Sequence, residues 1–253
     1  MWKIIPLKLA TMQLTKAARI AKCGVAANIG EVSEIPCIAW LLKEQETGRM
    51  ILVDAGPSKN PERDSRYHNP VTRTLGQQIW ECLKNQGVRM EDIREIILTH
   101  LHWDHAYGVK EFPWADVYVQ RKELQYSIAP FTVHKACYEL NDKENPPFYF
   151  SFYHQFKILD GDMEFTPGVR LITLPGHSPG SQGVLVDTEK GKCLIAGDLF
   201  NSMENFYEDI PTGVNTSLYD CARSFAKVRE LGDVMILPGH DDRVFEILVK
   251  DVR

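Results

Sequence analysis

The chain lacks the features that would place it in a membrane, secreted or nucleic-acid-binding class. Among its 253 residues, no apolar run approaches the roughly 20 residues needed to span a bilayer, and the start has no long apolar core of a secretory signal. The formal net charge is −5, without the basic cluster that phosphate backbones require. We therefore expect a soluble, cytoplasmic protein that binds a small molecule and neither nucleic acid nor a membrane.

The cysteines form no C-x-x-C pair, which argues against a zinc ribbon or a thioredoxin-like redox motif. They are scattered along the chain, mostly among apolar neighbours, as Cys23, Cys37, Cys82, Cys137, Cys193 and Cys221. A chain of this length can form a core without disulfides. We expect these residues to be small buried hydrophobes in a reducing compartment.

No repeat, low-complexity segment or flexible linker divides the sequence, so we expect a single domain over residues 1–253. Alternating apolar residues and turn residues predict strands at 4–9, 36–43, 50–53, 93–98, 116–119, 169–174, 183–186, 192–196 and 234–237. Helical spacing predicts helices at 74–85, 122–126 and 217–231. Groups of strands alternating with helices favour an α/β (α+β) fold in which two sheets pack together under helices.

One short stretch, LTHLHWDHAYG at 98–108, concentrates the side chains that most often bind metals. It places His100, His102, Asp104 and His105 within six residues. Histidines at i, i+2 and i+5 do not share a helical face, so a turn after the strand at 93–98 is the expected host. Loops at strand ends are where rigid scaffolds present functional groups.

Three later motifs also follow predicted strands. They are PGH at 175–177, AGD at 196–198 and PGH at 238–240. The candidate metal ligands are therefore His100, His102, Asp104, His105, His177, Asp198 and His240. This number exceeds the needs of one tetrahedral zinc ion and suits two ions about 3.5–4 Å apart. His68, His134 and His154 fall outside these motifs, and we expect them to be ordinary packed or surface residues.

Together the motifs resemble those of the metallo-β-lactamase superfamily. The matching segments are VDAG at 53–56, HLHWDHAYG at 100–108, PGHSPGSQG at 175–183, AGDLF at 196–200 and PGHD at 238–241. The resemblance implies a four-layer αββα sandwich. It also implies one metal held by His100, His102 and His177, a second held by Asp104, His105 and His240, and Asp198 bridging the two. Asp54 matches an aspartate that supports the metal loop without binding metal.

Within that family, the chain is most similar to the N-acyl homoserine lactonase branch. The ligand spacing supports this: 72 residues from His105 to His177, 21 to Asp198 and 42 to His240. The type zinc β-lactamases have a cysteine where this chain has Asp198, so antibiotic hydrolysis is not expected. One position departs from the lactonase pattern, because Asn201 stands where those enzymes usually place a tyrosine that contacts the substrate carbonyl. Tyr207 or Tyr107 could replace it.

The resemblance implies a dinuclear hydrolase in which a metal-bridging hydroxide attacks the carbonyl of a lactone. Asp104 is the expected catalytic residue that carries the proton to the leaving alkoxide, and Trp103 and Asn201 are expected to border the substrate. Zinc is the first expectation for both ions, and manganese, iron or cobalt suit the same ligands. The alternatives are a thioesterase of the glyoxalase II type, a phosphodiesterase or phosphotriesterase, and a mono-iron persulfide dioxygenase.

An aromatic run at 146–156, PPFYFSFYHQF, admits three interpretations. It could be a strand or helix that covers the core. It could form an apolar wall or lid over the metals, which would suit an acyl or aromatic substrate. It could instead pack against a second subunit, which would make the protein a homodimer.

Overall fold

The chain begins with a three-stranded antiparallel meander, as predicted. In the computed structural model, which describes residues 1–22, 30–142 and 144–249, the strands are β1 (Trp2–Thr15), β2 (Val32–Glu44) and β3 (Met50–Val53). β1 and β2 pair along almost their whole length, with a bulge between Lys8 and Ala10. The strands predicted at 4–9 and 36–43 are therefore parts of longer strands. In β1, the alternation of Ala10, Met12 and Leu14 with polar residues continues the strand pattern beyond the predicted end.

The remaining elements of the first half contain the helices and strands predicted between residues 74 and 126, in their predicted order, together with short elements that were not predicted. They are α1 (Lys16–Arg19), α2 (Pro61–Tyr67), β4 (Val71–Thr72), α3 (Ile79–Asn85), η2 (Met90–Asp92), β5 (Glu95–Ile97), α4 (Trp103–Ala106), η3 (Tyr107–Glu111), β6 (Asp116–Gln120), α5 (Arg121–Ile128), η4 (Thr132–Tyr138), η5 (Phe148–Ser151), η6 (Tyr153–Gln155) and β7 (Phe156–Leu159). Here η marks a short 3₁₀ helix.

The second half is a run of strands followed by two helices, a further strand and a final helix. Its elements are β8 (Met163–Thr166), β9 (Val169–Thr173), β10 (Gln182–Thr188), β11 (Gly191–Ile195), η7 (Gly197–Leu199), α6 (Met203–Glu208), α7 (Leu218–Glu230), β12 (Val234–Leu237) and α8 (Arg243–Val249). The predicted helix at 217–231 is α7, and Ser217 caps its first turn by accepting from the Asp220 amide.

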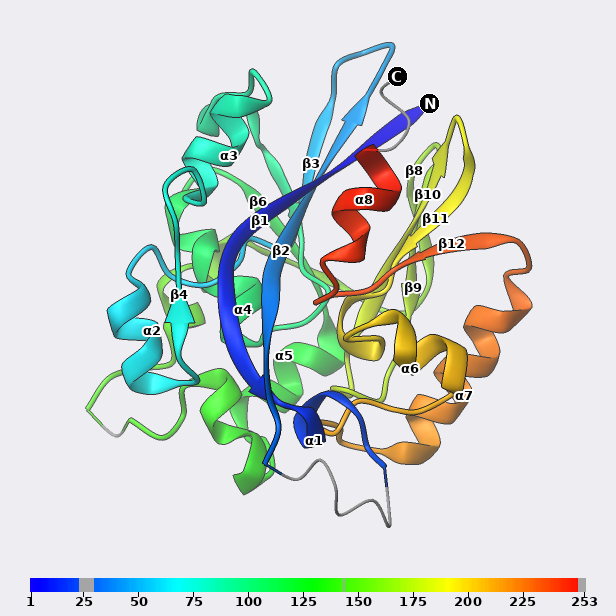
Figure 1. Cartoon of the computed structure of the whole chain (residues 1–253). Helices are drawn as coiled ribbons and strands as arrows, with labels where there is room; N and C mark the ends of the chain where they lie inside the picture. The colour runs from blue at the N-terminus through cyan, green and yellow to red at the C-terminus, as the bar shows by residue number, and fades with distance from the viewer. Residues whose placement is uncertain (23–29, 143, 250–253) are drawn as a thin grey trace.

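In the described residues, the strands form one twelve-stranded sheet that folds back on itself. The main path runs β12-β11-β10-β1-β2-β3-β5-β6-β7, while β9 pairs with β10, β8 with β9, and β4 with β1. A single residue pair, Trp2 with Thr188, joins β1 to β10. Figure 1 shows the two halves on either side of this junction, with α2 and α3 outside the first half and α7 outside the second.

Three apolar clusters account for the four layers. In β2, Ile38, Trp40 and Leu42 belong to the cluster between the two halves of the sheet. The alternate residues of the same strand, Cys37, Ala39 and Leu41, belong to the cluster under the helices of the first half. A third cluster packs α6 and α7 against the second half. Because side chains alternate across a strand, a strand buried on both faces produces the αββα arrangement that the sequence predicted.

The helix predicted at 74–85 begins later, at Ile79. Leu75, which fitted the helical spacing, is 97% exposed. Gly76 has φ +88°, a left-handed conformation that a helix cannot contain, and the Glu81 carboxylate caps the helix start by accepting from the Gln78 amide. A turn and a capping interaction therefore overrode the apolar periodicity. Leu218 of α7, also expected on an apolar face, is likewise exposed.

The aromatic run at 146–156 forms two 3₁₀ turns, η5 and η6, rather than a strand or a long helix. Phe148, Tyr149 and Phe152 are buried in the cluster under the helices of the first half, whereas Phe150 and Tyr153 are exposed. The segment therefore covers the core, which was the first of its three interpretations.

Of the cysteines, Cys37, Cys82, Cys193 and Cys221 are buried and Cys137 is partly buried, all as free thiols, while Cys23 lies outside the described residues. Within the described ranges, the helices are all too short or too polar to cross a membrane.

Candidate metal centre

The candidate ligands come from loops at one edge of the folded sheet. β3 and β5 are parallel, so the segments that follow them, which contain Asp54 and His100, begin at the same edge. β11 and β12 are also parallel, which brings the Asp198 and His240 loops together. A Cβ on Gly239 would lie 2.5 Å from Asp198 Oδ1, so only glycine at this position lets the two loops approach so closely.

The histidine-rich segment is partly helical. His100 lies in the turn after β5, and His102 is the N-cap of α4, a single helical turn that contains Asp104 and His105. The sequence correctly indicated that one helical face cannot hold all three histidines, but it did not predict this single helical turn. The backbone amides of His105 and Ala106 donate hydrogen bonds to the His102 carbonyl. These bonds close the helical turn and fix the backbone from which the side chains of Asp104 and His105 project.

The first group of side chains consists of His100, His102 and His177. His177 Nε2 lies 3.2 Å from His100 Nε2 and 2.9 Å from His102 Nδ1. All three residues are at most 5% exposed. Three nitrogen atoms within such distances form a compact set of the size that surrounds one metal ion.

The second group consists of Asp104, His105 and His240. His105 Nε2 lies 3.3 Å from His240 Nε2, and the Asp104 carboxylate lies 3.7 Å and 3.5 Å from these two nitrogens. Asp198 stands between the groups: its Oδ1 is 3.2 Å from both His105 and His240, and its Oδ2 is 3.6 Å from His177. Its Oδ2 also lies 3.2 Å from His240 Nε2, so Asp198 contacts residues of both groups.

The donor set fits metal ions rather than internal hydrogen bonds. Carbonyl oxygens accept from the Nδ1 atoms of His177 (Val214, 2.7 Å) and His240 (Pro36, 2.7 Å). Because a carbonyl can only accept, Nδ1 of each ring carries a proton, and Nε2 of the neutral ring presents a lone pair to the centre. Asp198 Oδ1, although buried, has no hydrogen-bond partner. Lone pairs that converge without protons between them are stabilised by a cation.

Burial and the nearby carboxylates divide the five imidazoles by their pKa. Desolvation lowers the pKa of His100, His102 and His177, so these imidazoles are neutral at physiological pH. Asp198 raises the pKa of His105 and His240, and these two rings in turn hold the pKa of Asp198 well below its usual value, although desolvation opposes this. Protons on His105 and His240 balance the carboxylate charge, and a bound cation would take their place. Asp198 is therefore a carboxylate, the form that binds metal.

Asp54 connects β3 to the metal loop. Its Oδ1 accepts from the Thr99 amide and its Oδ2 from the Thr99 hydroxyl and from His105 Nδ1, all at 2.8 Å. It has φ +57°, a conformation in which aspartate is one of the better-tolerated residues. These bonds orient the His105 ring and the start of the loop.

Glu123 of α5 is a second buried carboxylate beside the loops, and sequence reasoning missed it. It accepts from the Leu101 amide at 2.9 Å and from the Ser178 hydroxyl, so it ties the segments that contain His100 and His177. Tyr138 also donates to it at 2.9 Å. Burial raises the pKa of Glu123, while these donors oppose the rise. Apolar periodicity does not reveal Glu123, because the buried residues of α5 are the polar Glu123 and Ser127.

A cavity of about 90 Å³ opens onto the two groups. Trp103 and Asn201, the predicted substrate contacts, both line it, together with the apolar side chains of Met12, Leu14 and Val214. Asn201 donates from Nδ2 to Asp198 Oδ2 at 3.4 Å. Cys137 also lines the cavity, and burial raises its pKa to about 12, so it remains a neutral thiol.

The residues considered as replacements for the missing tyrosine lie elsewhere. Tyr207 is 68% exposed, and Tyr107 stacks on Phe148 beside Arg63 and Lys110. Neither lines the cavity at the centre, and neither do the described residues of the aromatic run at 146–156. The structure thus contradicts the use of that run as a wall over the metals.

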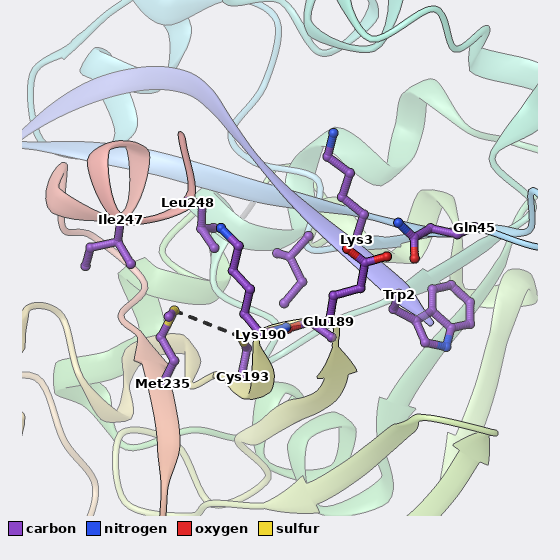
Figure 2. Close-up of a pocket in the computed structure, with 11 residues that line it drawn as sticks. Trp2, Lys3, Gln45, Glu189, Lys190, Cys193, Met235, Ile247 and Leu248 are labelled. Atoms are coloured by element: carbon purple, nitrogen blue, oxygen red, sulfur yellow. Dashed lines mark hydrogen bonds between the residues drawn. The ribbon is translucent and has the colours of Figure 1, made fainter. Parts of the chain in front are cut away.

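Of the remaining histidines, His154 is exposed and His134 is buried, where it pairs with the Tyr126 hydroxyl at 2.6 Å. A second pocket, of about 340 Å³, lies at the opposite end of the sandwich. Figure 2 shows Lys3, Glu189 and Lys190 among the residues that line it, and Cys193 next to Met235. It is far from the candidate ligands, since β11 and β12 begin near it and end at the metal edge.

Comparisons with known proteins agree with this geometry. A model of the metallo-beta-lactamase superfamily matches residues 33–240. An N-acyl homoserine lactonase of a Bacillus species is 30% identical over 227 residues, 84% of each chain. The N-acyl homoserine lactonase AiiA of Bacillus thuringiensis subsp. kurstaki is 29% identical over 233 residues, 85% of each chain. An N-acyl homoserine lactone hydrolase solved with N-hexanoyl-L-homoserine at its catalytic metal center has a TM-score of 0.80 at 26% identity, covering 97% of this chain and 95% of that one.

Proposed function

This chain belongs to the metallo-beta-lactamase superfamily, and on that premise we propose that it is a lactonase that uses two divalent metal ions to open an N-acyl homoserine lactone or a related lactone. The resemblance predicted from its motifs, the αββα fold and the broad class of metal-dependent hydrolase acting on ester bonds are confirmed. The observation that carries the finer proposal is the convergence of seven buried side chains into two groups that share Asp198.

We assign the ligands by these groups. His100, His102 and His177 would hold one ion, Asp104, His105 and His240 would hold the other, and Asp198 would bridge them. Imidazole and carboxylate ligands suit zinc first, and also manganese, iron or cobalt. Bound ions of this kind lower the pKa of a coordinated water towards neutrality and so supply hydroxide at physiological pH.

The chain's own residues supply orientation and proton transfer. Asp104 lies in the second group with a carboxylate 3.5 Å from His240 Nε2. There it can accept a proton from the attacking water and pass it to the ring oxygen that leaves when the lactone opens. Trp103 forms one wall of the cavity. Asn201 is shorter than tyrosine and cannot act as an acid, and its Nδ2 already donates to Asp198. Polarisation of the substrate carbonyl would therefore have to come mainly from the ions that the seven side chains would hold.

The experiment combines metal analysis with a substrate panel. Purified protein is analysed for metal content and is then offered N-hexanoyl-L-homoserine lactone, a thioester and a phosphodiester, with acid release and oxygen uptake recorded. We expect two ions per chain and acid release from the lactone. Activity confined to the phosphodiester or the thioester would replace the lactone as substrate. One iron with oxygen uptake would indicate a dioxygenase, and full turnover after exhaustive metal removal would refute metal dependence.

A further inference from the structure

His68, which the sequence placed among ordinary histidines, is connected to the cavity wall through Trp103. The two rings stack with centroids 4.0 Å apart and planes 2° apart. Trp103 lies between the candidate ligands His102 and Asp104 and lines the cavity at the metal centre. His68 is therefore in contact with the back of a side chain whose neighbours in sequence both face the metals.

The other edge of the His68 ring is anchored by charge. His68 Nε2 donates to Glu139 Oε1 at 2.8 Å, and Arg63 donates to both oxygens of that carboxylate, at 2.7 and 2.5 Å. Bidentate arginine–carboxylate pairs restrict both partners in distance and plane. The side chains of Arg63, Glu139, His68 and Trp103 thus form a continuous series, called here the Trp103 support.

The Trp103 support joins segments that are distant in sequence. Arg63 is in α2, His68 follows that helix, and Glu139 is the C-cap of η4. Glu139 is 8% exposed and has φ 55°, a left-handed conformation that is uncommon for glutamate. Strained backbone persists where surrounding contacts require it, and here the bonds from Arg63 and His68 hold the carboxylate. Burial would raise the pKa of Glu139, but these two partners prevail and lower it, so it remains charged.

We propose that His68 is a positioning residue that holds the Trp103 ring as a fixed wall of the substrate cavity, with Glu139 and Arg63 fixing His68 in turn. The identity of the substrate in this proposal rests on the proposed lactonase function, whereas the position of the Trp103 ring does not. A fixed wall lowers the entropy lost when a substrate is ordered beside it. Loss of His68 should change the affinity for the substrate or product rather than for metal. Three of the candidate metal-binding histidines are held by other contacts, with Asp54, Val214 and Pro36.

The test measures the affinity of zinc-loaded protein for N-hexanoyl-L-homoserine, a ring-opened product, by calorimetry. His68→Ala should raise Kd roughly two- to tenfold, the range for loss of one aromatic pair. His68→Phe retains a ring against Trp103 and should recover part of the affinity, whereas His68→Gln retains a polar group near Glu139 without the ring and should not. His154→Ala, which removes an exposed histidine, is the matched control and should bind as the wild type does. Zinc content should be equal in all variants.

A second measurement is independent of the ligand. The fluorescence of Trp103, obtained by subtracting the spectrum of the matching Trp103→Phe protein, should be quenched more readily by acrylamide in His68→Ala than in the wild type. A folded His68→Ala protein with unchanged product Kd and unchanged quenching would overturn the proposal. If wild-type protein neither binds the product nor hydrolyses the lactone, the lactonase function fails, and the quenching alone then decides whether His68 positions Trp103.

Discussion

The two groups of candidate ligands are held by different kinds of contact. In the second group, Asp54 binds the His105 ring itself, at 2.8 Å. In the first, Glu123 binds no ligand side chain and instead holds the Leu101 amide and the Ser178 hydroxyl, each next to a histidine. One carboxylate orients an imidazole, and the other fixes the backbone segments from which imidazoles project. We therefore expect the two groups to respond separately to mutation, except where a residue belongs to both.

Asp198 belongs to both groups, so its loss should have the largest effect. Asp198→Ala should remove both ions and lower kcat/KM for the lactone by more than about 100-fold, the upper value for residues that only orient ligands. Metal content by mass spectrometry and acid release would measure this. Asp160→Ala, at an exposed aspartate paired with Arg121, is the control. Retention of one full equivalent of metal in Asp198→Ala would show that Asp198 is not shared.

Asp54→Asn should weaken mainly the second group. Asparagine tolerates the left-handed conformation of residue 54, so the backbone is retained while the charged acceptor of His105 Nδ1 is lost. We expect a roughly 10- to 100-fold lower affinity for one ion, measured by competition with a chelator. Only one of the two equivalents of metal should be held more weakly. An equal loss at both ions would mean that the two supports are not independent.

Glu123→Gln should act on the first group and more weakly, by about tenfold in affinity. The amide has one acceptor oxygen where the carboxylate receives the Leu101, Ser178 and Tyr138 donors, so at least one buried donor loses its partner. The same chelator competition, with thermal unfolding of the metal-free protein as a reference, separates a metal effect from a general loss of stability. A variant that loses stability but binds both ions normally would restrict Glu123 to a structural role.

Thr99→Val should give the smallest change, spread over both groups. The Thr99 hydroxyl donates to Asp54 Oδ2 and lies 3.0 Å from His100 Nδ1, so it connects the Asp54 support to a ligand of the first group. Loss of this hydroxyl should cost about 1 kcal/mol, seen as a few-fold lower affinity for each ion. A change confined to one ion would place Thr99 with that group alone.

The order of elements could be predicted wherever apolar patterns were strong. The strands at 50–53 and 234–237 agree with β3 and β12 to the residue. Errors occurred where local contacts outweighed periodicity, as at Leu75, or where a predicted strand ended too early, as in β1. The short strands β4, β7 and β8 were not predicted, because two to four residues carry too little pattern to be distinguished from loops.

The motifs were enough to indicate which side chains could form a metal centre, because each candidate ligand follows a predicted strand within a compact motif. Tertiary structure alone decided what supports them. Glu123 and His68 carry no periodic or motif signal, since their roles depend on contacts with residues such as Ser178 and Glu139 that lie 55 and 71 positions away. Local sequence specifies local geometry, whereas a buried polar contact exists only once the folded sheet brings distant loops to one edge.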